Sequence, residues 1–133
     1  MILKVGPWES LAVGDVKRIA PIFAVRDLDR AIAHYERLGF ATRAYVGGGY
    51  GFATRDGIEI HLGVVRAADC GTSGAYLFVE DADELAATWR AAGIDVHPPE
   101  DTEWGQHEGA VVDPDGNVIR FGSPVRTTAS DDR

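Results

Sequence analysis

Hydrophobic and polar residues alternate with two different periods along the chain. Short segments of period two, such as "IEIHLGVV" at residues 58–65, predict β-strands. Two longer segments, beginning at Asp27 and Asp81, place apolar residues three and four positions apart and predict amphipathic helices. An aspartate at each start predicts an N-cap, and Gly39 and Gly93 predict the helix ends. The chain therefore predicts a strand, a helix and further strands, in that order, twice.

The two predicted helices belong to an internal repeat. At one constant offset the matched pairs are Val25 and Val79, Asp27 and Asp81, Asp29 and Asp83, Ala33 and Ala87, Tyr35 and Trp89, and Gly39 and Gly93. "DGIEIHLG" and "DGNVIRFG" match again at a larger offset, which predicts extra residues in the loop that contains Trp104. We interpret the chain as a tandem duplication of a βαβββ unit, with Tyr35 and Trp89 in the core.

The repeat also predicts the domain organisation. A polar segment, residues 66–73, is expected to link the copies. The predicted parts are a leader at residues 1–16, one domain at 17–125 with modules at 17–65 and 74–124, and a flexible tail at 126–133. The leader contains Trp8 and is expected to pack as an arm on its own subunit or on a neighbour.

Composition narrows the class of protein. The chain has 133 residues, 45% of them hydrophobic and 26% charged, which suits one globular domain. The net charge of −8 argues against nucleic acid or an anionic membrane as partner; it favours a cationic ligand or serves only solubility. One cysteine, Cys70, excludes an internal disulfide. No segment has the pattern of a signal peptide or a membrane span, so we expect a cytoplasmic protein.

Several motifs, in order, resemble a known family. The repeated unit with "DLDRAIAHYERLGF" in one copy and "DPDGN" in the other resembles the vicinal oxygen chelate superfamily over residues 17–124. "YERLGFATRAY", "FATRDGIEIHL", "AYLFVEDADELAATW" and "EWGQHEGAVVDPDGNVIRF" look most like its bleomycin resistance proteins. The resemblance implies an α+β fold in which tandem βαβββ modules curl a mixed sheet into half-barrels with the helices outside. It also implies a homodimer, swapped or side by side, with ligand clefts at the subunit interface.

The resemblance further implies where a metal site would lie. Enzymes of the superfamily hold a divalent metal through the first and last strand of each module, and the matching positions here are Ala20, His61, Gly74 and Arg120. Alanine and glycine offer no side-chain ligand, and arginine stays cationic. We therefore expect no metal and no cofactor. The other histidines, His34, His97 and His107, are expected at the surface of the first helix and in loops.

Strand alternation predicts which side chains line the cleft. Glu59, His61, Tyr76, Phe78 and Arg120 alternate with apolar residues assigned to the core. The complete candidate ligand-binding set is Tyr45, Tyr50, Phe52, Glu59, His61, Tyr76, Phe78, Trp104 and Arg120. The family resemblance assigns ligand contact most directly to Tyr50 and to Trp104 of the "WG" element. Alternatives are loop packing for Trp104 and an internal ion pair, such as Arg120 with Glu59.

Three functions remain open at this point. The first is sequestration, without catalysis, of a small planar aromatic antibiotic, including a glycopeptide of the bleomycin type. Glu59, Glu103 and Glu108 would suit a cationic drug, whereas Arg43 and Arg120 favour an anionic or carbonyl-rich face. The second is a metal-independent lyase or isomerase, with His61 as acid or base and Arg120 polarising a carbonyl. The third is an accessory dimer whose cleft has no ligand.

Overall fold

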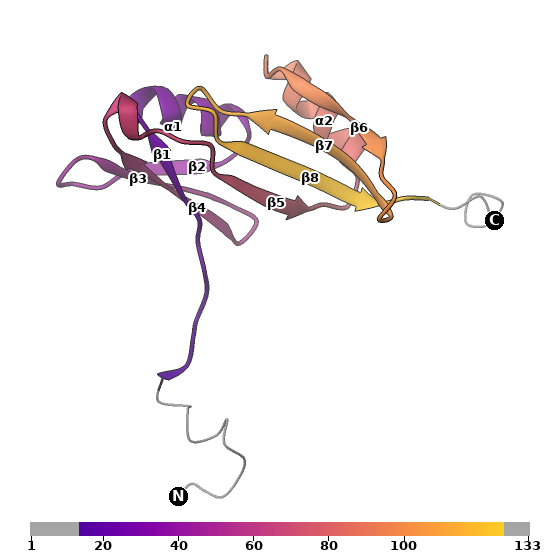
Figure 1. The fold of residues 1–133 in the computed structure, drawn as a ribbon, viewed down its shortest axis with the longest axis horizontal. Helices are drawn as coiled ribbons and strands as arrows, with labels where there is room; N and C mark the ends of the chain where they lie inside the picture. Colours follow the sequence, from indigo (N-terminus) through magenta and orange to yellow (C-terminus); the bar gives the residue numbers. More distant parts are fainter. Residues whose placement is uncertain (1–13, 127–133) are drawn as a thin grey trace, which may run out of the picture.

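The computed structural model describes residues 14–126, and its elements follow the predicted order (Figure 1). The first module comprises β1 (Ile22–Val25), α1 (Leu28–Arg37), β2 (Ala41–Ala44), β3 (Tyr50–Arg55) and β4 (Ile58–Val64). The second comprises β5 (Gly74–Phe78), α2 (Ala82–Ala91), β6 (Val96–Asp101), β7 (Gln106–Val112) and β8 (Val118–Pro124). A single 3₁₀ turn at Ala67–Asp69 lies in the linker.

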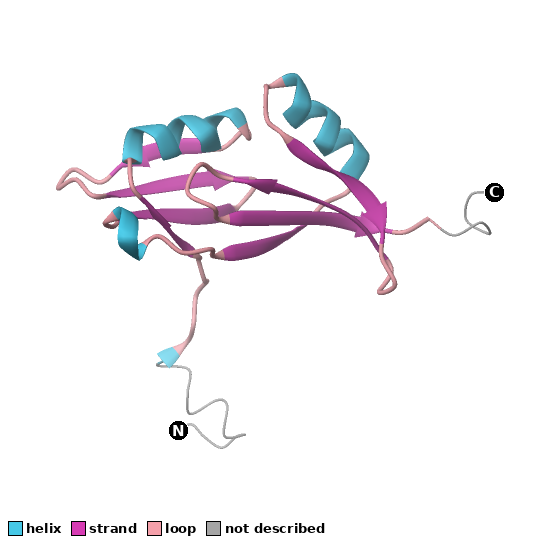
Figure 2. Ribbon diagram, turned by 45° about the horizontal axis from the view of Figure 1, so that its top comes forward, coloured by secondary structure: helices cyan, strands magenta, loops and turns pink. Residues whose placement is uncertain are grey.

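Each module forms a four-stranded mixed sheet, so the α+β fold with two βαβββ modules is confirmed. The strand orders are β1-β4-β3-β2 and β5-β8-β7-β6. The pairs β1–β4 and β5–β8 are parallel, and the remaining pairs are antiparallel. Both helices lie on the same side of the strand layer (Figure 2). The opposite side carries no α-helix within residues 14–126, and we call it the open face.

The predicted helix ends are confirmed. The Asp27 carboxylate accepts from the Arg30 amide at 3.1 Å, and the Asp81 carboxylate accepts from the Glu84 amide at 3.0 Å. Each bond satisfies an amide that the first helical turn leaves without a backbone partner. Gly39 and Gly93 follow the helices with φ of 91° and 86°, in the left-handed region that favours glycine. The repeat therefore conserves both ends of each helix.

One hydrophobic core extends through both modules. It includes Phe23, Val25, Ile60 and Leu62 from the first module and Val111, Ile119 and Phe121 from the second. Tyr35 and Trp89 are buried in it, as predicted. Each also reaches across to the other module, because Trp89 Nε1 donates to the Leu38 carbonyl at 2.9 Å and the Tyr35 hydroxyl donates to Asp113 at 2.9 Å.

The turn Asp113–Asn117 fastens the second module to the first. Asp113 accepts from the amides of Asp115 and Asn117 at 2.8 and 2.9 Å, which fixes the shape of the turn. Asn117 Nδ2 donates to the Ala24 carbonyl of β1 at 2.9 Å. Asp115 Oδ1 accepts from Arg26 and Arg30, at the start of α1, at 3.1 and 3.0 Å. The segment Asp113–Asn117, whose sequence is typical of a tight turn, therefore also forms a contact between the two modules.

The extra residues of the second copy are not in the Trp104 loop, contrary to the prediction. That loop spans residues 102–105 and is shorter than its counterpart at 45–49. The turn at 113–117 is longer than the turn at 56–57, and β6 is longer than β2. The β6–β7 pairing is irregular between His97 and Glu100, around Pro98 and Pro99, because proline cannot donate to a neighbouring strand.

The three surface histidines also differ from expectation. His34 is buried against Tyr35, with ring centroids 5.1 Å apart, because it lies on the same helical face. Burial lowers the pKa of His34. His97 lies in β6 and His107 in β7 rather than in loops, because these strands extend further than the sequence pattern indicated.

The ends of the chain lie largely outside the description. Most of the predicted leader at 1–16, with Trp8, and nearly all of the tail at 126–133 fall outside the described residues. Within residues 14–126 neither helix has the length and apolar character needed to cross a bilayer.

Candidate functional site

The predicted ligand-binding residues of the strands project from the open face. In β4 and β8, Ile60, Leu62, Ile119 and Phe121 are buried beneath the helices, so alternate side chains point away from them. The open-face residues of the candidate set are Tyr50, Phe52, Glu59, His61, Tyr76, Phe78 and Arg120. Strand alternation therefore placed these residues on the correct face.

The first module gathers three of them around the imidazole of a fourth, His61. The Tyr50 hydroxyl and His61 Nδ1 are 2.8 Å apart, and His61 Nε2 is hydrogen-bonded to Glu59. The Phe52 ring contacts the His61 ring edge-on, with centroids 4.9 Å apart. Glu59 also binds Arg18, from the segment that precedes β1. Because an ionised carboxylate only accepts, Nε2 carries a proton, and in a neutral ring Nδ1 accepts the hydroxyl proton of Tyr50.

The second module gathers its residues around one carboxylate. Glu108 Oε1 accepts from the Tyr76 hydroxyl at 3.0 Å and from Trp104 Nε1 at 3.3 Å. Arg120 NH1 lies 3.5 Å from Glu108 Oε2. The Tyr76 and Phe78 rings are 4.9 Å apart between centroids. Glu108 therefore orients an aromatic loop residue, an aromatic strand residue and a guanidinium at once.

The two clusters occupy equivalent places in the repeat. Tyr50 pairs with Gly63 across β3 and β4, and Glu108 pairs with Gly122 across β7 and β8. His61 and Arg120 are likewise equivalent, two positions earlier on the last strand of each module. The first module therefore has a hydrogen-bonded pair of tyrosine and histidine at the place where the second module has a pair of glutamate and arginine. Both clusters combine aromatic and charged side chains, with Glu59 in the first and Glu108 and Arg120 in the second.

The glycines beneath these clusters make room for aromatic rings. A Cβ added to Gly122 would lie 2.2 Å from the Tyr76 hydroxyl oxygen, so no other residue fits without moving that ring. A Cβ on Gly63 would lie 3.6 Å from the Tyr50 ring, in ordinary contact. Gly122, which lies opposite Glu108, therefore tolerates a larger side chain less well than Gly63 does.

For two candidate residues, Arg120 and Tyr45, the structure differs from what the sequence suggested. Arg120 pairs with Glu108 instead of Glu59, because β7 lies next to β8 in the same sheet whereas Glu59 belongs to the other module. Tyr45 lies at the tip of the β2–β3 hairpin, 55% exposed and packed on Gly47, and no described contact joins it to either cluster. The Arg43 guanidinium carbon lies 3.9 Å from the centre of the Phe52 ring.

Sequence reasoning did not identify Arg18, and it gave Glu108 only a general acidic role. Arg18 precedes the first strand, where no period places a side chain, so the sequence carried no signal for its contact with Glu59. The equivalence of Glu108 with Tyr50 follows from the strand registers and not from the matched sequence segments, so no sequence pattern indicated its role. A hollow of about 450 Å³ adjoins Glu108 on the open face, where His97 and Arg120 also line it.

The surroundings of Glu59 and Tyr76 shift the pKa values of these two side chains. The hydrogen bond from His61, with the contact from Arg18, holds the pKa of the Glu59 carboxyl below its ordinary range, so Glu59 is ionised at neutral pH. Desolvation and the Glu108 carboxylate raise the pKa of the Tyr76 phenol, so Tyr76 stays neutral and donates. The site therefore presents fixed negative charge at both modules, balanced by arginine at each.

Comparisons with known proteins decide the family. The sequence profile of the Glyoxalase/Bleomycin resistance protein/Dioxygenase superfamily matches residues 16–121. The chain belongs to this superfamily. A bleomycin resistance protein of Klebsiella pneumoniae is 30% identical over 111 residues, which cover 76% of this chain and 87% of that protein.

Solved structures extend the likeness to antibiotic-binding proteins. A bleomycin-binding protein complexed with bleomycin aligns with a TM-score of 0.70 and 26% identity, covering 83% of this chain and all 100% of that chain. An antibiotic binding protein from Streptomyces sp. CB03234 aligns with a TM-score of 0.64 and 27% identity, covering 84% of this chain and 99% of that one. The predicted membership and the likeness to bleomycin resistance proteins are confirmed.

The residues on the open face do not fit the divalent metal of the superfamily's enzymes. The cross-strand neighbour of His61 is Ile22, and that of Arg120 is Tyr76. Ala20 and Gly74 lie two residues earlier on the chain. Isoleucine supplies no ligand, arginine repels a cation, and the Tyr76 hydroxyl is bound to Glu108. Within residues 14–126 no three His, Cys, Asp or Glu side chains cluster as a ligand set.

Proposed function

We propose that this protein binds a small planar aromatic antibiotic on its open face and holds it without chemical change. The observation that carries the proposal is the exposure of aromatic rings around Glu108. Phe78 is 82% exposed and Trp104 is 69% exposed. Trp104 is bonded to the Glu108 carboxylate and Phe78 packs beside Tyr76, and exposed rings held in this way are typical of a surface that a flat ligand covers. The bleomycin-binding relative supports the same class of ligand.

The proposal includes a homodimer. One copy of the described chain leaves its open face uncovered, with Ile22, Phe78 and Val112 exposed there. A second copy facing this surface would bury those side chains and close the shallow hollow beside Arg120 into a cleft. Sequestration in such a cleft needs only tight binding, so the absence of metal ligands is no obstacle to it.

A fluorescence titration tests the ligand. Metal-free bleomycin should quench tryptophan emission of the wild-type protein, and Trp104→Phe should lose most of the quenching while retaining the fold by circular dichroism. No response up to high micromolar drug would reject bleomycin as the ligand. Mass spectrometry of the drug recovered after incubation should show an unchanged mass, and a modified drug would reject sequestration without chemistry.

One observation favours a second candidate, a metal-independent enzyme. Arg18, Glu59, His61 and Tyr50 form a continuous chain of contacts that orients an imidazole on the open face. Such an imidazole can transfer a proton to or from a carbonyl compound, with Arg120 to stabilise an oxyanion. Turnover of a small carbonyl compound by EDTA-treated protein, lost in His61→Ala with ligand binding retained, would support this candidate. Equal turnover by His61→Ala would reject it.

A further inference from the structure

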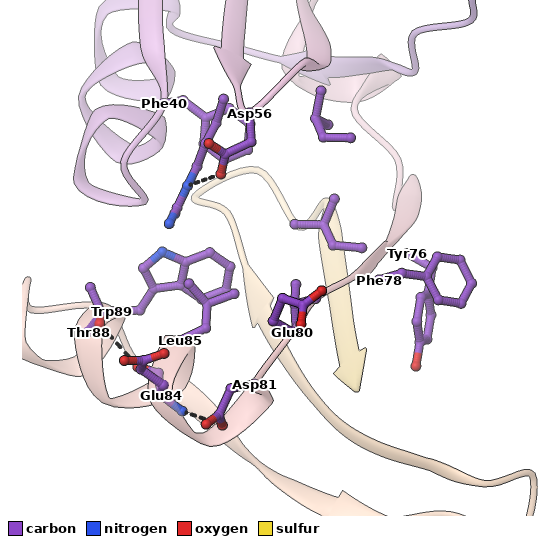
Figure 3. A pocket seen from close by; sticks show the side chains of 14 residues that line it. Phe40, Asp56, Tyr76, Phe78, Glu80, Asp81, Glu84, Leu85, Thr88 and Trp89 are labelled. Atoms are coloured by element: carbon purple, nitrogen blue, oxygen red, sulfur yellow. Dashed lines mark hydrogen bonds and ion pairs between the residues drawn. The ribbon is translucent and has the colours of Figure 1, made fainter. Parts of the chain in front are cut away.

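One hollow of the described residues lies at the junction of the modules and adjoins the Glu108 cluster, because Tyr76 and Phe78 also line it. It has a volume of about 570 Å³ and lies between the Asp56–Gly57 turn and α2 (Figure 3). Its apolar wall includes Ile58, Leu77 and Leu85 above the buried Phe40 and Trp89. Its polar lining includes Glu80, Glu84 and Arg55, whose guanidinium is paired with Asp56. We call this hollow the junction groove.

The repeat shows what fills the equivalent place. Trp89 is the repeat mate of Tyr35, so the mate of the junction groove lies beside α1. There the turn Asp113–Asn117 occupies the space and binds Tyr35 through Asp113. The corresponding turn of the first module, Asp56–Gly57, has only two residues between its strands. This shorter turn does not fill the groove, which therefore stays open.

The charges at the two equivalent places are opposite. Beside α1, Arg26 and Arg30 both bind one oxygen of Asp115, at 3.1 and 3.0 Å. Their repeat mates beside α2 are Glu80 and Glu84. Within residues 14–126 neither of these two carboxylates has an ion-pair partner. The positions that hold two arginines against Asp115 in the first module therefore hold two glutamates, facing the junction groove, in the second.

We infer that the junction groove is a second ligand site, for a small organic cation. The ligand would place an apolar, preferably aromatic, body against Ile58, Leu77 and Leu85, and one ammonium or guanidinium between Glu80 and Glu84. The volume lies within the roughly 300–1,000 Å³ of small-molecule pockets. The Asp113–Asn117 turn of a second copy does not suit the groove, because Asp115 would face two like charges.

The probe for this site is 1-naphthylmethylamine, with its neutral N-acetyl derivative as the matched compound. Calorimetry should detect binding of the amine, weakening with added salt, and much weaker binding of the amide. The double variant Glu80→Gln/Glu84→Gln should lose about tenfold in affinity, as two partly exposed charge pairs together imply. A control pair, Asp29→Asn/Asp95→Asn, removes the same charge outside the groove and should leave affinity unchanged.

Charge reversal gives an independent test. Glu80→Arg/Glu84→Arg reproduces the arginine pair that holds Asp115, so this variant should bind 1-naphthylacetate and reject the amine. Amide chemical shifts of the wild-type protein with the amine should change in α2 and around Asp56–Ile58. Absence of binding, equal binding of amine and amide, or unchanged affinity in the Gln variant would each overturn the inference. Shifts confined to His61 and Arg120 would overturn it too, while leaving the open-face proposal intact.

Discussion

The Tyr35 hydroxyl donates a hydrogen bond of 2.9 Å to the Asp113 carboxylate, and this bond joins the first helix of one module to the last turn of the other. Both residues are buried. Asp113 also accepts from the backbone of its own turn and from Asn117 Nδ2. A buried carboxylate is costly unless it is bonded on all sides, so Tyr35 completes the set that makes this turn stable.

Replacing Tyr35 with phenylalanine should therefore destabilise the whole domain. The change removes one donor and leaves Asp113 buried with less compensation, so we expect a loss of about 1–3 kcal/mol in the free energy of unfolding. Urea denaturation followed by circular dichroism measures it. The control is Tyr45→Phe, whose exposed hydroxyl should contribute within about 0.5 kcal/mol. Equal stabilities for the two variants would show that Asp113 does not depend on Tyr35.

The ion pairs of Asp115 should contribute less, and their effect should depend on salt. Asp115→Asn removes the charge that Arg26 and Arg30 share. The Asp115 side chain is buried, but the two arginine side chains are 46% and 42% exposed, so water that solvates the arginines limits the expected loss to about 1 kcal/mol. The difference between wild type and variant should shrink at high salt because exposed charges are screened. A difference that does not change with salt would indicate that packing of the turn, rather than charge, explains the loss.

The fold could be predicted from the sequence because each local signal, such as a helix cap, occurs in both copies of the duplicated unit. The caps Asp27 and Asp81 and the terminal glycines Gly39 and Gly93 follow from properties of single turns, and a period of two assigns strand faces. The junction could not be predicted in this way. Which module the Asp113–Asn117 turn contacts depends on how two sheets pack, and no local pattern encodes that arrangement.

The candidate site shows the same division. Alternation placed His61 and Arg120 on the open face, but not their partners, since hydrogen bonds depend on which strands are neighbours. An ion pair of Glu59 with Arg120 was one alternative, and Glu59 instead binds His61 on its own strand. His34 was expected at the surface because histidine usually lies there, whereas the helix turns it into the core. Whether the nine proposed residues contact a ligand stays a prediction.

Removing the Glu108 charge should change both a titration and ligand binding. In Glu108→Gln the pKa of the Tyr76 phenol should fall toward its ordinary value, because the carboxylate that raises it is gone while the burial of the ring stays. The phenolate absorbance is measured as a function of pH for the wild type and for Tyr76→Phe, and their difference gives the titration of Tyr76. The same difference, measured between Glu108→Gln and the double variant Glu108→Gln/Tyr76→Phe, gives it without the Glu108 charge. We also expect weaker antibiotic binding, since Glu108 orients Trp104 and Arg120. Glu103→Gln removes an equal charge from the neighbouring loop and should leave the Tyr76 titration unaltered.

Stability should depend on pH through His107. Its ring binds Asp83 of α2 at 2.9 Å and Asp101 of β6 at 2.7 Å. The hydrogen bond that the ring donates to Asp83, followed by the one to Asp101, raises the pKa of His107 above 6.5. A raised pKa means that the folded state holds the proton more tightly than the unfolded state. The stabilisation is therefore complete below pH 6.5, and it is lost as the pH rises through the higher pKa of the folded protein.

The comparison that isolates this effect is wild type against His107→Gln, measured by urea denaturation from mildly acidic to alkaline pH. The wild type should be more stable by up to about 1 kcal/mol at acidic pH, because the two carboxylates are exposed, and the difference should decline toward alkaline pH. His34 acts with the opposite sign: burial lowers its pKa, so its own contribution is lost as the pH falls below 6.5. Because His34 is present in both proteins, it cancels in the difference. A difference between wild type and His107→Gln that grows with pH would contradict the role of His107.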